Sequence, residues 1–199
     1  MTADADSAGL ILASGSPRRG ELLSGAGYSF RKIVPIDEEP PFEKTGLKPI
    51  AYAKENARRK AESVARGGAR GVILAADTIV VLGELVYGKP TDEKDARRIL
   101  SALAETTHEV VTAVVLRHTQ EERELVRHDA TRVTMKPMTR QELDAYLATG
   151  LWRGKAGAYG IQDENDAFVE RFEGSFSNVV GLPLELLARM LDEMRGTGE

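Results

Sequence analysis

The sequence predicts an α/β protein built on a mixed β-sheet. Short apolar runs alternate along the chain with amphipathic segments of helical period, and two of the connections between apolar runs are tight polar turns. Alternation of strands and helices is typical of parallel β-α-β units, whereas tight turns join antiparallel neighbours. We therefore expect parallel and antiparallel strands in one sheet, with helices flanking it.

Length and composition favour one domain. The 199 residues include 42% hydrophobic and 29% charged side chains, ordinary globular values that suffice for a sizeable core. We expect residues 1–8 to form a flexible N-terminus and residues 9–195 a single domain. The absence of cysteine excludes disulfides, thiolate catalysis and cysteine-based zinc sites.

The first half of the chain shows the alternation clearly. The expected elements are a strand over 9–13, a helix from 17 to 25, a strand over 30–36, a helix over 50–66 and a strand over 71–82. Ser16 is a credible helix N-cap, because Pro17 follows at the first helical position, where its missing N–H costs nothing. The strand over 71–82 carries the strongest buried-strand pattern, with Asp77 between its two apolar runs.

The second half adds hairpins. The expected elements are a turn at 83–84, a strand over 85–87, a helix over 92–104, strands over 109–116 and 124–135, a helix from Thr139 to Gly150, a strand over 167–172 and a helix over 183–194. His108, His118 and His128 lie near hairpin ends without metal-ligand spacing. We therefore interpret all three as exposed strand residues.

Charge and hydropathy restrict the partners and the cellular location that we expect for the protein. The formal net charge of -4 is a mild argument against a nucleic-acid partner. The longest apolar run, 71–83, is broken by Asp77 and too short to span a bilayer. Residues 1–8 lack a basic region followed by an apolar stretch, so no signal peptide is evident and the cytoplasm is the expected location.

The segment from Ser14 to Arg19 is a candidate anion site. A strand runs there into a loop of small residues and then into a helix start, whose free N–H groups and dipole favour anions. Arg18 and Arg19 add phosphate donors, and both are expected to be exposed. A capped helix with two solvated arginines would have the same pattern. No Walker A sequence occurs in the chain.

Asp77 is the second candidate. A carboxylate inside an apolar strand is costly unless it is paired, hydrogen-bonded or bound to metal. It is interpreted as a metal ligand or general base at a strand position facing a cleft. The alternative is a structural aspartate satisfied by backbone N–H groups.

Two later segments are weaker candidates. Pro90 restricts Lys89 to extended conformations, which would let the lysine reach a phosphate. The glycine-rich tract 154–162 permits close backbone approach to a ligand, and Gln162 offers a donor and an acceptor for a base edge. A solvated lysine and a flexible surface loop are the alternatives.

Taken together, these segments resemble the Maf (septum-formation inhibitor) family of nucleotide pyrophosphatases. The matching stretches, in family order, are residues 12–19, 56–61, 76–78, 88–90, 155–162 and 179–184. No single stretch is decisive, but the ordered set is specific and spans the chain from about residue 10 to 192.

The resemblance implies two lobes around a long curved mixed sheet, with the active site in the cleft between the lobes. It also implies a cytoplasmic enzyme, often a homodimer, that needs a divalent cation such as Mg²⁺ or Mn²⁺. Such an enzyme splits a nucleoside triphosphate into a nucleoside monophosphate and pyrophosphate. Nucleic acid and membrane are not expected partners.

The resemblance also assigns roles to residues. Asp77 matches the proton acceptor and a metal ligand, and Glu38 or Glu39 is the second acidic candidate for the metal. The positions that tune substrate choice are Arg18, Thr78 and Gln162. The positions around the triphosphate are Ser14, Arg19, Lys60 and Lys89.

The tract 155–162 is similar to the branch of the family that acts on dTTP and UTP. One departure is the acidic run 163–166 directly after Gln162, where that branch usually has glycines. Two alternatives stay open: a family member that prefers 7-methyl-GTP, and a non-catalytic nucleotide-binding regulator of septum formation.

Overall fold

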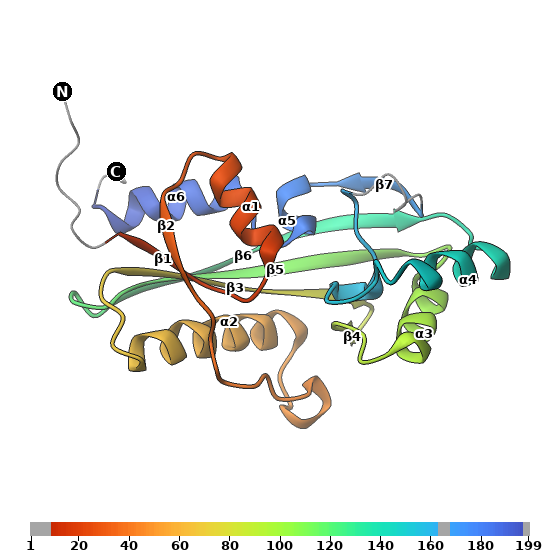
Figure 1. Cartoon of the computed structure of the whole chain (residues 1–199), viewed down its shortest axis with the longest axis horizontal. Helices are drawn as coiled ribbons and strands as arrows, with labels where there is room; N and C mark the ends of the chain where they lie inside the picture. The colour runs from red at the N-terminus through yellow and green to blue at the C-terminus, as the bar shows by residue number, and fades with distance from the viewer. Residues whose placement is uncertain (1–8, 163–167, 197–199) are drawn as a thin grey trace.

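A long mixed sheet forms the centre of the computed structural model, which describes residues 9–162 and 168–196 (Figure 1). Its strands are β1 (Leu10–Ala13), β2 (Phe30–Ile33), β3 (Val72–Leu82), β4 (Leu85–Tyr87), β5 (Thr107–His118), β6 (Arg123–Met135) and β7 (Val169–Glu173). The helices are α1 (Pro17–Gly25), α2 (Pro49–Arg66), α3 (Glu93–Leu103), α4 (Arg140–Thr149), α5 (Phe176–Val180) and α6 (Leu184–Met194). Two 3₁₀ turns are η1 (Phe42–Lys44) and η2 (Ala156–Ala158). The regions expected to be a flexible N-terminus and an acidic run, 1–8 and 163–166, lie outside the described residues.

The sheet combines two kinds of pairing, as the sequence predicted. Its strand order is β2-β1-β3-β5-β6-β7, with β4 paired to β3. The strands β2, β1 and β3 are parallel, whereas all the other pairs are antiparallel. The α/β class and the mixed sheet are therefore confirmed.

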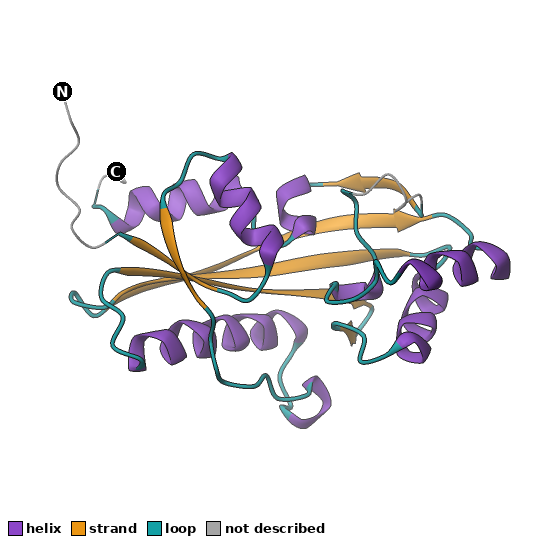
Figure 2. Ribbon diagram, in the orientation of Figure 1, coloured by secondary structure: helices purple, strands orange, loops and turns teal. Residues whose placement is uncertain are grey.

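Helices cover both faces of this sheet (Figure 2). On one face α2 packs through a row of small residues, Ala53, Ala57 and Ala61, which let the helix lie close to the strands. On the other face α1 and α6 pack through Leu23, Leu187 and other apolar side chains. None of the helices in the described part of the chain is long and apolar enough to cross a bilayer.

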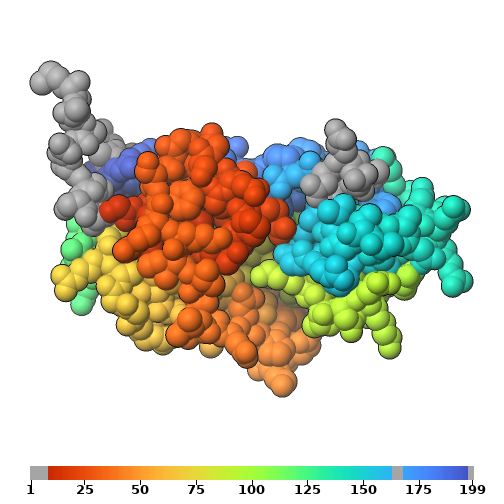
Figure 3. Space-filling model, viewed as in Figure 1, coloured from red at the N-terminus to blue at the C-terminus, as the bar shows by residue number. Residues whose placement is uncertain are grey.

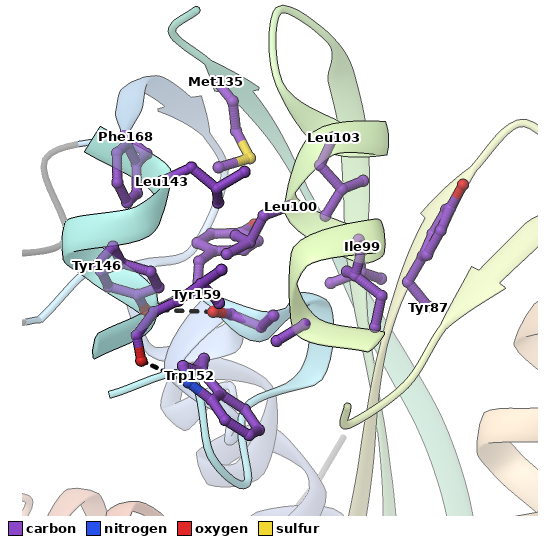
Figure 4. Close-up of a cluster of buried hydrophobic side chains, with 14 of the residues drawn as sticks. Tyr87, Ile99, Leu100, Leu103, Met135, Leu143, Tyr146, Trp152, Tyr159 and Phe168 are labelled. Carbon is purple, nitrogen blue, oxygen red and sulfur yellow. Dashed lines mark hydrogen bonds between the residues drawn. The ribbon is translucent and has the colours of Figure 1, made fainter. Parts of the chain in front are cut away.

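A third core fills the far end of the sheet, where α3 and α4 pack (Figure 4). The face of α3 that carries Ile99, Leu100 and Leu103 is buried in it, as its helical spacing predicted. The helix α4 begins with a capping box in which Thr139 and Glu142 exchange hydrogen bonds. This end of the sheet is the second of the two lobes that the family resemblance implied.

One edge of β3 is interrupted. Residues 73–75 pair there with β1 and residues 80–82 with β4, so residues 76–79 have no neighbour on that edge among the described strands. Both neighbouring strands run toward this gap and end at it, β1 at Ala13 and β4 at Tyr87. The crossover helices α1 and α2 lie on opposite faces, so the gap sits at a topological switch point between β1 and β3, the usual place for a ligand in such sheets.

Candidate active site

A cavity of about 450 Å³ opens at the gap in the sheet. The surface is hollowed where the orange N-terminal segment faces the cyan segment around residues 150–160 (Figure 3). Nine of the ten residues proposed from the sequence line the cavity: Ser14, Arg18, Arg19, Glu39, Lys60, Asp77, Thr78, Lys89 and Gln162. The tenth, Glu38, is exposed and is not part of the lining.

The carboxylate of Asp77 is held from the α2 side. Only 4% of the residue is exposed. Its Oδ2 accepts a hydrogen bond from Asn56 Nδ2 at 3.2 Å, and its Oδ1 lies 2.6 Å from Lys60 Nζ. Asn56 and Lys60 are one helical turn apart on the same face of α2, which explains why both reach one carboxylate.

Lys60 joins Asp77 to Glu39. Its ammonium nitrogen lies 2.7 Å from Glu39 Oε1 and donates a third bond to the carbonyl oxygen of Ala76 at 3.2 Å. All three N–H groups of the lysine are thereby directed at oxygens of the protein. Ala76 has no partner on the β1 side of β3, so this bond ties α2 to the backbone of β3 beside the gap.

Glu39 reaches the cavity because its loop is anchored to the same helix. The hydroxyl of Tyr52, one turn before Asn56, donates to the carbonyl oxygen of Pro40 at 2.8 Å. Partial desolvation in the cavity opposes ionisation of Glu39, but the charge and hydrogen bond of Lys60, with weaker help from Lys89, outweigh it, and the pKa of Glu39 lies below its usual value. Glu39 is therefore an ionised partner of Asp77.

These two carboxylates fit a divalent cation that arrives with a phosphate ligand. Magnesium in proteins is commonly held by one or two carboxylates, with water and substrate phosphate as the other ligands. The described residues contain no group of three or more acidic, histidine or cysteine side chains that could hold a metal alone. The pair of Asp77 and Glu39 is therefore suited to a shared cation rather than to a closed structural metal site.

Arg19 lies on the opposite face of β3. Its guanidinium donates to Gly181 O at 2.8 Å, Thr78 Oγ1 at 3.0 Å and Ser14 Oγ at 3.2 Å. Only 8% of the residue is exposed, so the expectation that Arg19 is exposed was wrong. Burial lowers its pKa, and the nearby charge of Asp77 partly offsets this effect.

Arg18 connects the two sides of the cavity. Its guanidinium donates to the carbonyl oxygen of Gly154, in the second lobe, at 2.9 Å. The N–H groups at the start of α1 receive no side-chain cap, although Ser16 occupies the N-cap position. Uncapped N–H groups beside a cationic side chain favour the binding of an anion at the start of α1.

Lys89 and the second lobe supply further polar groups. Desolvation lowers the pKa of Lys89, and the charge of Glu39 partly offsets the effect. Arg153 and Lys155 also line the cavity. The sequence analysis did not single out Arg153, and it included Lys155 only as part of the tract 154–162. Asn56 was missed as well, because a polar residue within a helix rich in Lys and Arg carries no local sign of its contact with Asp77.

The histidine interpretation needs two corrections: only 15% of the His118 side chain is exposed, and His108 is buried. His108 is only 2% exposed, and burial lowers its pKa to about 4. Its Nε2 lies 2.6 Å from the hydroxyl oxygen of Tyr159, a residue that lines the cavity. The expectation that His108 is an exposed strand residue was therefore wrong.

Fold and site together define a class of protein. An α/β sheet with a switch-point cavity, an uncapped helix start, several cationic side chains and a pair of carboxylates is suited to binding a phosphorylated ligand with a divalent cation.

Comparisons with known proteins identify the family. A family model described as "Maf-like protein" matches residues 9–194. The dTTP/UTP pyrophosphatase of Cereibacter sphaeroides is 46% identical over 184 residues, covering 92% of this chain and 93% of the relative. The proteins of that name from Syntrophomonas wolfei and Dictyoglomus thermophilum are 44% and 41% identical over 186 residues, covering 94% and 93% of this chain and 97% and 95% of the relatives. The chain belongs to the Maf family.

Proposed function

We propose that this chain is a nucleoside triphosphate pyrophosphatase that hydrolyses dTTP and UTP to the monophosphate and pyrophosphate. Relatives that carry the name dTTP/UTP pyrophosphatase align with almost its whole length. The observation that carries the proposal is the held carboxylate of Asp77 in a cavity lined by cations. A protein that only binds an anion gains nothing from a carboxylate there, whereas a hydrolase needs an acceptor for the proton of water.

In the proposed reaction, one group of residues binds the triphosphate and another group activates the attacking water. The uncapped start of α1, with Arg18 and Lys89, binds the triphosphate and neutralises its charge. Water attacks the α-phosphorus, the bond from that phosphorus to the pyrophosphate oxygen breaks, and Asp77 accepts the proton that the water loses. Asn56 and Lys60 orient Asp77 for this step.

Asp77 and Glu39 are the residues that would hold the divalent cation, Mg²⁺ or Mn²⁺. When bound, the cation supplies additional neutralisation of the phosphate charge. Of the two acidic candidates from the sequence, Glu39 is favoured over Glu38 because only Glu39 contacts Lys60 and lines the cavity.

Base choice is assigned to the second lobe. Gln162 lies at the rim of the cavity and offers both a donor and an acceptor to a pyrimidine edge. A purine would pair these groups differently, and unpaired polar groups penalise the wrong base strongly. Thr78 is the second residue assigned to base choice; it lines the cavity from β3, and its hydroxyl is held by hydrogen bonds with Arg19 and Thr112.

The test is a pyrophosphate-release screen across canonical and modified nucleoside triphosphates with Mg²⁺ or Mn²⁺. We expect the highest kcat/KM for dTTP and UTP, and a loss of about 10²–10⁴ in kcat for Asp77→Asn with the fold retained. Near-normal kcat in a folded Asp77→Asn protein would refute the catalytic assignment. Preference for 7-methyl-GTP would overturn the assignment to the dTTP/UTP branch, and binding without turnover would favour a non-catalytic regulator.

The proposal also includes a single domain over residues 9–195, a cytoplasmic location and a homodimer.

A further inference from the structure

Behind one wall of the cavity lies a buried histidine–tyrosine pair. Tyr159 lines the cavity, while His108 is not part of the lining and lies two residues before the lining residue Val110 on the same face of β5. The hydroxyl oxygen of Tyr159 and Nε2 of His108 are 2.6 Å apart, and the two rings meet edge to face with centroids 5.5 Å apart. We propose that His108 is a positioning residue for the base-binding wall, holding Tyr159 and through it residues 160–162. This inference rests on the function proposed above.

The wall needs support because its turn is strained. Gly157 has a φ of 72° and Ala158 a φ of 63°, and the left-handed region is unfavourable for alanine. Space is also tight, since a Cβ on Gly157 would lie 2.7 Å from Val80 Cγ2. Contacts from outside the turn must therefore keep it in this conformation.

Three hydrogen bonds hold successive residues of the turn. The N–H of Gly157 donates to Gly88 O at 3.1 Å, and the hydroxyl of Tyr146 donates to Ala158 O at 3.2 Å. The third joins Tyr159 to His108 and is the one nearest in sequence to residues 160–162, which line the cavity. Figure 4 shows Tyr159 among buried side chains of α3 and α4, so its ring is fixed while the backbone that follows it forms the wall.

The protonation state of His108 determines which atom donates in its hydrogen bond with Tyr159. Burial lowers the pKa of the imidazole to about 4, so the ring is neutral at pH 7 and carries one N–H. No described residue hydrogen-bonds to Nδ1. A buried N–H without an acceptor is rarer than an unused lone pair, so the proton belongs on Nε2, which donates to the oxygen of Tyr159.

His108→Phe tests the proposal because it keeps an aromatic ring and removes the donor. We expect KM for dTTP to rise about 5- to 10-fold, the value of one hydrogen bond, with kcat within about twofold of the parent. Tyr159→Phe should give at least as large a rise, and the double variant should be no worse than Tyr159→Phe alone, because the bond that His108→Phe removes is already lost in Tyr159→Phe. His108→Gln, whose amide nitrogen is the same number of bonds from Cβ as Nε2, should restore part of the loss.

Tyr87→Phe is the matched control. Tyr87 belongs to the same buried cluster, and its hydroxyl makes no hydrogen bond within the described part of the chain. This control should keep the KM of the parent. A second readout is nucleotide affinity from the fluorescence of Trp152, the only tryptophan of the chain, which lies in the same cluster.

The outcomes separate this inference from the proposed function. An active parent with unchanged KM and affinity in folded His108→Phe would overturn the positioning role alone. Equal losses in His108→Phe and Tyr87→Phe would also overturn it, because general loosening of the core would then be the cause. A parent that hydrolyses no nucleoside triphosphate would overturn the proposed function and this inference together.

Discussion

Replacing Arg19 by methionine should destabilise the protein, whereas the same change at its neighbour Arg18 should not. Methionine is unbranched and apolar like the stem of arginine, so it keeps the packing of the stem and removes the guanidinium. Arg19 loses three hydrogen bonds inside the protein, to Gly181, Thr78 and Ser14. Arg18 loses one hydrogen bond at the rim of the cavity.

The size of the effect follows from these contacts. Hydrogen bonds that involve a charged group contribute about 1.5–3 kcal/mol each, but removing a buried charge recovers part of its desolvation cost. The net loss for Arg19→Met is therefore about 2–4 kcal/mol. For a domain of this size that corresponds to a fall in Tm of about 5–15 °C. For Arg18→Met, we expect a change within about 0.5 kcal/mol, or less than about 2 °C.

Thermal unfolding followed by circular dichroism, without nucleotide, compares the two variants with the parent under identical conditions. The reasoning fails if Arg19→Met melts within about 2 °C of the parent. Such a result, together with weaker binding of triphosphate, would show that the guanidinium acts as a free phosphate ligand. It would then not be a structural connection between α1, β3 and the turn at Gly181.

Two further predictions concern the carboxylate and the buried histidine. Asn56→Leu removes the donor to Asp77 Oδ2, so kcat should fall about 10-fold with a smaller change in KM. Steady-state kinetics test this expectation, and an unchanged kcat in a folded variant would contradict it. The native pKa of His108, about 4, is below the usual value near 6.5, so the unfolded chain binds more protons between these values and the free energy of unfolding falls as the pH drops through that window. Urea unfolding at pH 7 and pH 5 should show the parent losing about 2 kcal/mol more than His108→Phe, and equal losses would contradict the shift.

The strands and helices of this fold could largely be predicted from the sequence. Apolar periodicity located β3, α3 and the β5–β6 hairpin within a few residues, because each buries one face or both against the core. The strand β2 ends at Ile33, before the expected 36, where the chain approaches Pro35. The helix α5 escaped prediction because its five residues are too few to show a period.

Most of the residues that line the cavity could be predicted from local motifs and from the family resemblance, and one of them from local chemistry alone. Asp77 stands out because a carboxylate interrupts an apolar strand. Asn56 and His108 do not stand out, because each has polar neighbours in sequence. The structural role of each depends on a hydrogen bond to a residue at least 20 positions away. Burial of Arg19 likewise depends on Gly181, which is 162 residues distant along the chain. Such pairings are set by tertiary packing, which local sequence does not encode.

The gap beside residues 76–79 of β3 has a consequence for how such an enzyme can change. In a continuous sheet, Asp77 and Thr78 would face separate compartments divided by the thickness of the backbone layer. Here both side chains line one cavity at the open edge, so under the proposed function proton transfer and base recognition would use adjacent residues of one strand that face opposite sides of the sheet. Under the proposed function, we therefore expect substitutions in the core under α2 to alter the carboxylate of Asp77 and substitutions behind α1 to alter base recognition, with little interference between the two. Extending β4 by two residues would pair it with Ile79 and Thr78 and would reduce the opening to residues 76 and 77, leaving less room for a ligand at this edge.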